Sequence, residues 1–244
     1  MLTDRELERY QRQIALFGEE AQARLASARV VIVGAGGLGC PVALYLAAAG
    51  IGEIRLIDGD VVDRTNLNRQ VLHGDRDIGR AKVESAAEKL RAQNPEIRVV
   101  TRYATIDEGN AAVLAGGADL IIDATDNFPA RYILNRVALQ SGVPLIHGAV
   151  RGFDGQATTI IPGRTACLAC IFPIPPPEEE VVPMVGTTPG IIGLVQANEA
   201  VKYITSTGDL LANRLLVWDG RAATMATLEV ERQENCSVCG DGRC

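Results

Sequence analysis

The residues with the most recognisable chemistry are the glycines of Gly34-Ala35-Gly36-Gly37-Leu38-Gly39, which have the spacing G-x-G-x-x-G. Glycine turns tightly and lets backbone N–H groups approach a phosphate at a helix N-terminus. Asp58 follows roughly 20 residues later, where nucleotide-binding α/β folds place a carboxylate that accepts hydrogen bonds from ribose. The pattern indicates a nucleotide pocket, although a turn that only packs a helix against a strand remains an alternative. It does not separate NAD, FAD, SAM and ATP.

Four cysteines form a second set, in two C-x-x-C pairs, Cys167/Cys170 and Cys236/Cys239. Each pair can present two thiolates to one ion, and the two pairs together complete a tetrahedral zinc site with four cysteine ligands. A site with no open position is structural, so we expect it to pin the C-terminal tail against the loop near Cys167. Two unrelated thiol pairs, or a redox pair, are the alternatives, but neither pair follows a first strand into a helix.

The other two cysteines give less information. Cys40 falls on the helix expected after the glycine turn, and we expect it to be a small buried residue. Cys244 is the last residue of the sequence and supports no interpretation.

Alternating strands and helices must position the glycines and the acids. Apolar, β-branched runs at 29–33, 53–58, 97–100, 118–123 and 143–149 predict strands, and helical spacing is found at 41–46, 78–94, 107–115 and 128–140. This alternation predicts an α/β fold with a Rossmann-like, doubly wound, mostly parallel sheet. The polar loop 60–70 leaves the carboxyl edge of that sheet, where ligands of such folds bind.

Two charged residues fall at the same edge. Lys82 lies near the start of the helix predicted for 78–94, from where a lysine can aim at a phosphate. Asp126 follows an apolar strand directly. It can either cap the next helix before Phe128 or bind a ligand, and it can do both.

The two ends of the chain depart from this alternation. Thr3 and Glu6 have capping-box spacing, and Leu7, Tyr10 and Ile14 then recur on one face, so we expect an amphipathic helix at the start. After 150 we expect a strand at 157–161, a loop over 164–189 and a helix over 191–204. A closing antiparallel pair is predicted at 215–218 and 227–230.

We expect a single domain over 1–244. It comprises an N-terminal arm (1–27), a nucleotide-binding core (28–150) and a C-terminal part (151–244) with a crossover loop at 171–189.

Composition narrows the class of protein. The chain has 244 residues and a net charge of −6, which argues against a nucleic-acid surface. No apolar run approaches the length of a membrane span, and the first residues are charged where a signal peptide would be apolar. We therefore expect a cytoplasmic protein with reduced cysteines.

The ordered motifs together resemble the MoeB/ThiF/HesA family, the bacterial relatives of ubiquitin-activating enzymes. The resemblance covers nearly the whole chain. It rests on 9–13, the glycine turn with Cys40, 58–60, 66–70, 79–82, 125–127 and the two cysteine pairs.

This resemblance implies adenylation of the C-terminal Gly-Gly carboxylate of a ubiquitin-like sulfur-carrier protein, by ATP and magnesium, with release of pyrophosphate. It places Gly37 against the nucleotide, Asp58 at the ribose, and Asn68, Arg69 and Lys82 at the phosphates. It makes Asp126 the magnesium ligand. The residues that the resemblance and the motifs assign to nucleotide binding are Gly34, Gly36, Gly37, Gly39, Asp58, Asp60, Asn66, Asn68, Arg69, Lys82, Asp126 and Asn127.

Arg12 shows how composition and resemblance can differ. By composition, its face of the first helix is a solvated face. The resemblance instead implies that Arg12 reaches the ATP of a neighbouring subunit, and hence that the protein is a homodimer. Arg12, Arg69, Lys82 and Asp126 are thus the expected catalytic residues, and a sulfurtransferase or cysteine desulfurase is a further expected partner.

The chain departs from the family in one place. Many relatives carry a cysteine in the crossover loop for a covalent link to the carrier, and the matching position falls near Val182. The sequence has no cysteine between Cys170 and Cys236. We therefore expect a reaction that stops at the adenylate and leaves sulfur delivery to another protein. Activation without covalent capture, or Cys40 or Cys244 in that role, are the alternatives.

Two other functions remain open at this stage. The glycine turn and Asp58 also suit an NAD-dependent oxidoreductase, and the missing loop cysteine suits a scaffold that only binds a ubiquitin-like tail. Charge favours adenylation, because a carboxylate can attack a triphosphate only where cations and a metal neutralise the phosphates. A nicotinamide enzyme does not need Arg69, Lys82 and Asp126 around the turn.

Overall fold

The computed structural model describes residues 2–175 and 182–240, and these form an eight-stranded sheet in the order β3-β2-β1-β4-β5-β6-β7-β8. The strands β1 to β5 run parallel, and the last three continue antiparallel from β5. The predicted doubly wound sheet and its antiparallel extension are confirmed. The strands are β1 (Arg29–Val33), β2 (Glu53–Asp58), β3 (Arg98–Tyr103), β4 (Leu120–Asp123), β5 (Leu145–Arg151), β6 (Asp154–Ile160), β7 (Arg214–Asp219) and β8 (Thr224–Glu229).

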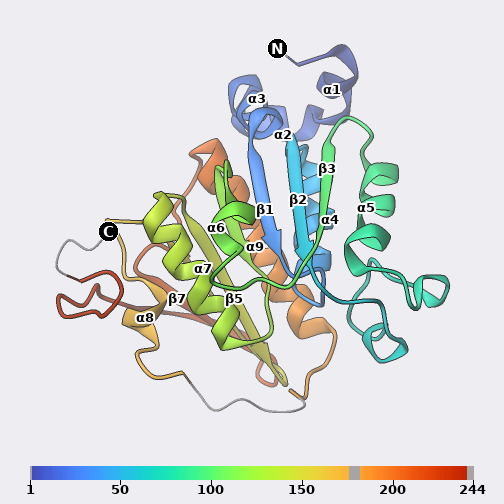
Figure 1. The fold of residues 1–244 in the computed structure, drawn as a ribbon. Coiled ribbons are helices and arrows are strands. Elements are labelled where there is room, and N and C mark those ends of the chain that lie inside the picture. Colours follow the sequence, from blue (N-terminus) through green and yellow to red (C-terminus); the bar gives the residue numbers. More distant parts are fainter. Residues whose placement is uncertain (1, 176–181, 241–244) are drawn as a thin grey trace.

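Helices cover both faces of the sheet (Figure 1). One layer contains α4 (Gly39–Ala49), α5 (Lys82–Gln93) and α9 (Thr187–Thr205), and the other contains α6 (Ala111–Ala115) and α7 (Phe128–Ser141). The central strands are apolar on both sides, since Ile32 and Ile122 belong to the core under the first layer and Val31 and Ile121 to the core under the second. This double burial explains why these strands read as continuous Val/Ile runs without alternation.

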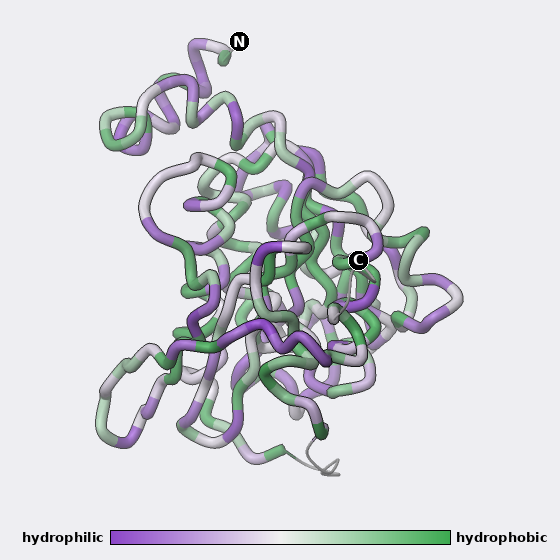
Figure 2. Tube along the Cα trace, turned by 90° about the vertical axis from the view of Figure 1, so that its left-hand side faces the viewer, coloured by the Kyte–Doolittle hydropathy of each residue, from purple (hydrophilic) through white to green (hydrophobic). Residues whose placement is uncertain are grey.

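The N-terminal segment consists of three short helices, so the prediction of one helix is wrong in detail. They are α1 (Asp4–Arg9), α2 (Gln11–Phe17) and α3 (Glu19–Ser27). Thr3 caps α1 with the predicted capping box. Gly18, with φ +84°, separates α2 from α3, a backbone conformation that suits glycine. Figure 2 shows these helices, of mixed hydropathy, extending from the body of the molecule.

The predicted helix over 78–94 begins four residues late. Residues 78–81 instead close a loop, because Gly79 N–H donates to Val62 O and Val62 N–H donates to Arg80 O. Gly79 has φ +85°, which a helix does not allow. Lys82 is therefore the first residue of α5.

The predicted loop over 164–189 also contains helix at both ends. A short helix, α8 (Leu168–Ile171), forms at the first cysteine pair, and α9 begins at Thr187. Pro189 lies in the first turn of α9, where its missing N–H removes no helical hydrogen bond. The middle of the crossover loop, 176–181, and Cys244 lie outside the described residues.

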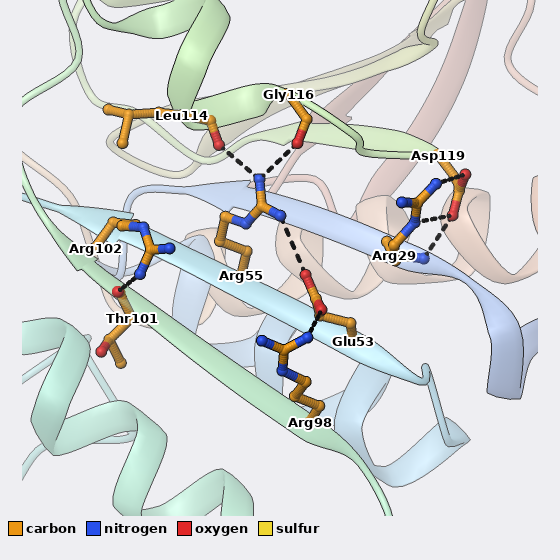
Figure 3. A network of polar contacts seen from close by, with 9 residues as sticks. All are labelled: Arg29, Glu53, Arg55, Arg98, Thr101, Arg102, Leu114, Gly116 and Asp119. Carbon is orange, nitrogen blue, oxygen red and sulfur yellow. Dashed lines mark hydrogen bonds and ion pairs between the residues drawn. The ribbon is translucent and has the colours of Figure 1, made fainter.

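A network of arginines and acids joins the strands at the end of the sheet where β1 and β2 begin (Figure 3). Glu53 accepts hydrogen bonds from Arg55 (Nη2 to Oε1, 3.2 Å) and from Arg98 (Nη1 to Oε2, 2.9 Å). Arg55 Nη1 also donates to the carbonyls of Leu114 and Gly116. The network ties the connection after α6 to β2, and it lies away from the carboxyl edge on which the glycine turn is found.

None of the helices in the two described ranges has the length and apolar character needed to cross a membrane.

Candidate functional site

The glycine turn lies where β1 ends and α4 begins, pressed against the end of β4. Gly34 has φ +100°, and a Cβ there would lie 2.4 Å from the carbonyl oxygen of Ala124. A Cβ on Gly39 would lie 1.8 Å from the carbonyl oxygen of Gly34. Two of the four predicted glycines are therefore required by the backbone itself. The strand order reverses between β1 and β4, the position where ligands bind in such sheets.

Gly36 and Gly37 face other parts of the chain. A Cβ on Gly36 would lie 3.5 Å from Gln70 Nε2, and one on Gly37 would lie 3.2 Å from Pro189 and 3.7 Å from Arg69 Cγ. The loop 66–70 and the start of α9 thus border the turn. Gly186, just before α9, packs on the same loop, because a Cβ on it would lie 2.4 Å from the carbonyl oxygen of Asn68.

Asp58 holds the turn through its carboxylate. Oδ2 accepts from Ala35 N–H at 2.8 Å, and Oδ1 accepts from Asp60 N–H at 2.8 Å. Burial raises the pKa of Asp58, and the hydrogen bond from Ala35 opposes this rise. Each oxygen keeps a free lone pair, so the carboxylate can still accept a hydroxyl group of a ligand.

Lys82 and Asp60 form an ion pair beside Asp58. The Lys82 side chain is 8% exposed, and its Nζ lies 2.7 Å from Oδ2 of Asp60, whose side chain is 70% exposed. A buried ammonium needs such a partner. The structure thus joins two predicted site residues, and it provides a cation at the N-terminus of α5.

Arg69 and its neighbours occupy the loop. Arg69 Nη1 donates to Thr65 O at 2.8 Å and to Asn68 Oδ1 at 3.0 Å. Asn66 Oδ1 accepts from Asp63 N–H at 3.1 Å, as part of a capping box in the same loop. Asn66 therefore shapes the loop, whereas Arg69 borders the turn through its Cγ and the Asn68 side chain is exposed in the same loop.

Asp126 is exposed and follows Thr125, whose backbone nitrogen would lie 3.4 Å from a Cβ on Gly34. Asn127 is the residue that caps α7, because its Oδ1 accepts from Ala130 N–H at 3.0 Å. The alternative in which Asp126 caps that helix is therefore wrong. Within the described residues, the one hydrogen bond that the Asp126 carboxylate accepts comes from the Asn127 amide, at 3.3 Å.

Arg12 does not join this group. Its helix, α2, packs at the far end of α4, where Gln13 Nε2 donates to Ala49 O and Gly50 faces the ring of Tyr10. The 11 residues of α4 span about 16 Å between this contact and the glycine turn. Arg12 is exposed there. It cannot serve the turn of its own chain from this position.

The four paired cysteines come together in the structure, as predicted. All four are buried, and their Sγ atoms lie within 4.8 Å of one another. The closest approaches are 3.9 Å (Cys167 to Cys170), 3.7 Å (Cys167 to Cys236) and 3.4 Å (Cys170 to Cys239). Sulfur atoms about 2.3 Å from a central zinc would be about 3.8 Å apart, so the cluster fits a tetrahedral ion. Cys40 is separate and fully buried, and burial raises its pKa to about 12.

Two buried acids that the sequence analysis did not select hold the segments around the site. Asp123, at the end of β4, accepts from His147 Nδ1 at 2.7 Å and from the Thr125 hydroxyl at 2.7 Å. Burial opposes the ionisation of Asp123, but these hydrogen bonds lower its pKa. This network fixes Thr125, next to Asp126. In the sequence, Asp123 was indistinguishable from the other acids that follow the strand.

Asp77 is the second of these acids and fixes the loop before Lys82. It accepts from Gly74 N–H and Arg80 Nη1, each at 2.8 Å, and from Lys89. Burial acts against ionisation, but the hydrogen bonds from Lys89 and Gly74 outweigh it and lower the pKa of Asp77 to about 2. No motif marked this residue, because its neighbours are set by the fold.

Comparison with known proteins places this site in context. The family described as "ThiF family" matches residues 10–238. The chain is 45% identical to the SAMP-activating enzyme E1 of Haloferax volcanii, over 97% of this chain and 90% of that protein. It is 41% identical to the sulfur carrier protein adenylyltransferase of Thermus thermophilus, over 98% and 93%.

Other relatives are longer. The chain is 40% identical to adenylyltransferase and sulfurtransferase MOCS3 of Drosophila sechellia, over 98% of this chain but only 54% of that protein. Among solved structures it resembles E. coli MccB with ATP, with a TM-score of 0.86 and 27% identity, over 96% of this chain and 75% of that one.

The role of Asp77 gives a test in solution. We expect Asp77→Asn to lower the free energy of unfolding at pH 7 by roughly 1–3 kcal/mol, because the amide has one acceptor oxygen instead of two and no charge to pair with Lys89 and Arg80. Its carboxyl has a pKa of about 2 when folded and an ordinary value of 3.8. It therefore stabilises the fold fully above the ordinary value, and the effect is lost as the pH falls toward 2.

Urea unfolding of wild type and Asp77→Asn between pH 7 and pH 3 measures how the difference in the free energy of unfolding depends on pH. Asp75→Asn, at an exposed ion pair with Arg64, is the matched control and should change little. A destabilisation by Asp77→Asn that is as large at pH 3 as at pH 7 would contradict this role.

Proposed function

The chain belongs to the ThiF family, and we propose that it is an adenylyltransferase that activates the C-terminal carboxylate of a ubiquitin-like sulfur-carrier protein with ATP. The names of the two relatives matched over nearly their whole length support this substrate class. The observation that carries the proposal is the set of charges around the glycine turn. Lys82, Arg69 and Asp126 all come from segments in contact with the turn or with Asp58.

Each part of the site has a role in this proposal. The turn from Gly34 to Gly39 lies under the phosphates, with Gly37 against the nucleotide, and Asp58 accepts the ribose hydroxyls. Asn68, Arg69 and Lys82 contact the triphosphate. An oxygen of the carrier carboxylate attacks the α-phosphorus, and the bond from that phosphorus to the β-phosphate oxygen breaks. The products are an acyl-adenylate and pyrophosphate.

Neutralisation of charge is the chemical task of the protein side chains. Two anions approach in this reaction, so cations must already stand at the phosphates. Asp60 pairs with Lys82 and so stabilises the buried ammonium beside the proposed phosphate site. Magnesium would supply further positive charge when bound. The exposed carboxylate of Asp126 suits it, because Mg²⁺ prefers one or two carboxylates together with phosphate oxygens.

The reaction ends at the adenylate in this proposal. The sequence has no cysteine in the crossover loop, and Cys40 is buried with its pKa raised to about 12, so it is a poor nucleophile. Sulfur would come from another protein. The sulfurtransferase activity in the name of the MOCS3 relative belongs to a protein of which this chain spans about half.

The position of Arg12 supports a shared site in a homodimer. Arg12 is exposed at the far end of α4 and cannot reach the turn of its own chain. We propose that it serves the phosphates bound by a second copy. The fit of the cysteine cluster supports a structural zinc ion held by Cys167, Cys170, Cys236 and Cys239.

The central test is carrier-dependent ATP–pyrophosphate exchange. We expect Asp126→Asn to reduce the exchange rate by at least about 100-fold, since a neutral amide holds magnesium poorly. Asp209→Asn, which changes an exposed acid between α9 and β7, should leave the rate close to that of wild type. Robust exchange by Asp126→Asn would remove this residue from the mechanism, and tight NADH binding without ATP binding would favour an oxidoreductase.

Metal analysis tests the cysteine cluster. We expect about one zinc per chain in wild type and in Cys40→Ala, and none in Cys236→Ala. Chelation should lower Tm by at least about 5 °C, because the ion joins segments far apart in sequence only in the folded state. Freshly purified wild type without zinc would contradict a zinc site.

Mixed dimers test the placement of Arg12. Arg12→Ala and Lys82→Ala should each be inactive, and a mixture should recover up to about a quarter of wild-type activity, because half the dimers would contain one intact site. Labelled subunits confirm that exchange between dimers has occurred. If subunits exchange and activity stays absent, Arg12 acts within its own chain or not at all.

A further inference from the structure

His73 is one of the two histidines of the sequence, and it is buried against the glycine turn. It lies in the loop between the 66–70 segment and α5 and is 7% exposed. Its Nε2 is 3.0 Å from the carbonyl oxygen of Ala35, and its Nδ1 is 2.9 Å from Ser85 Oγ. The imidazole thus bridges the turn and α5.

The hydrogen-bond partners fix where the protons lie. The carbonyl of Ala35 can only accept, so His73 carries its proton on Nε2. Lys89 Nζ donates to Ser85 Oγ at 2.8 Å, and Lys89 is itself held by Asp77. The Ser85 hydroxyl is therefore free to donate to Nδ1. The chain of donors runs from Lys89 through Ser85 and His73 to the carbonyl of Ala35.

A neutral ring is consistent with the surroundings. Burial lowers the pKa of His73, and the positive charges of Lys89 and Lys82 lower it further. The hydrogen bond to Ala35 and the charge of Asp77 act in the opposite direction but do not prevail.

The contact matters because of the peptide unit that it holds. A trans peptide group is planar, so its C=O and N–H point in opposite directions. When the Ala35 carbonyl is directed at His73, the Gly36 N–H is directed away from it, on the other side of the turn. Asp58 fixes the preceding peptide unit, through Ala35 N–H. Two side chains, one at the end of β2 and one from the loop before α5, therefore hold consecutive peptide units of the turn.

We propose that His73 is a positioning residue, which orients the Gly36 N–H toward a bound phosphate by donating from Nε2 to the carbonyl of Ala35. The role rests on the proposed binding of ATP at this turn. His73 does not itself touch the ligand. The network through Ser85, Lys89 and Asp77 keeps the ring in the required tautomer.

Two substitutions separate this role from simple packing. In His73→Gln the amide nitrogen can occupy the place of Nε2 and still donate to Ala35. In His73→Asn the shorter amide reaches only the place of Nδ1 and leaves the carbonyl with only the weak thiol donor of Cys40, at 3.4 Å. We expect His73→Asn to weaken ATP binding, measured by calorimetry without carrier, by about tenfold, and His73→Gln by less than about threefold.

The tautomer is measured directly by NMR on ¹⁵N-histidine-labelled wild type. With two histidines in the sequence, the signals absent from His73→Gln belong to His73. We expect Nε2 to be protonated and Nδ1 unprotonated at neutral pH, and Tm values of the two variants identify any general loss of folding.

The outcomes are distinct. Equal ATP affinity of the two variants at equal Tm, or a proton on Nδ1 alone, would overturn the positioning role. Wild type that binds ATP but gives no carrier-dependent exchange would overturn the proposed adenylation and leave the positioning role standing. Wild type that binds no ATP would overturn both.

Discussion

The close approach of the glycine turn to the end of β4 is the constraint on which the rest of the site depends. At Gly34 the two backbones leave no room for a side chain, and the 34–39 turn closes on itself just as tightly at Gly39. The turn therefore has one position relative to β4, and Thr125 and Asp126 leave that strand next to it. Parallel pairing of β1 with both β2 and β4 then places Asp58 and Asp126 on the same edge of the sheet.

Buried polar groups fix the conformation of the loops at the carboxyl edge of the sheet, which apolar packing does not fix. The loops at the carboxyl edge have few apolar residues, so hydrogen bonds must fix them, and a buried hydrogen-bond network has few alternative arrangements. Asp123 with His147 fixes the segment after β4, and Asp77 with Lys89 fixes the loop before α5. These networks underlie the site. Of the charged residues proposed to meet the ligand, Asp126 is exposed and Asp58 and Arg69 are partly exposed, whereas Lys82 is buried beside Asp60.

The C-terminal third closes the molecule around this edge. The start of α9 borders Gly37 through Pro189, and its Gly193 approaches Pro41 of α4 so closely that a Cβ would lie 2.6 Å from that ring. The cysteine cluster joins the segment at α8 to the tail after β8. Helix α9 thus packs on the sheet and also limits the space over the glycine turn. The fold of the C-terminal part therefore affects the shape of the pocket.

The sequence by itself determined the order of strands and helices, the glycine turn, the acid that ends β2 and the two cysteine pairs. These features are local, because periodicity, turn chemistry and ligand spacing are written in neighbouring residues. Only the tertiary structure decided that Asn127 and not Asp126 caps α7, that Lys82 pairs with Asp60, that Arg12 lies at the far end of α4, and that His73 supports the turn. The cap is a local contact whose choice between two neighbouring polar residues depends on the backbone geometry, whereas the other three depend on contacts between residues distant in the chain. A buried polar residue also has the same letter in the sequence as an exposed one. The break at Tyr10 and the late start of α5 were missed because they depend on such distant contacts, since Tyr10 packs on Gly50 and Val62 pairs with the loop before Lys82.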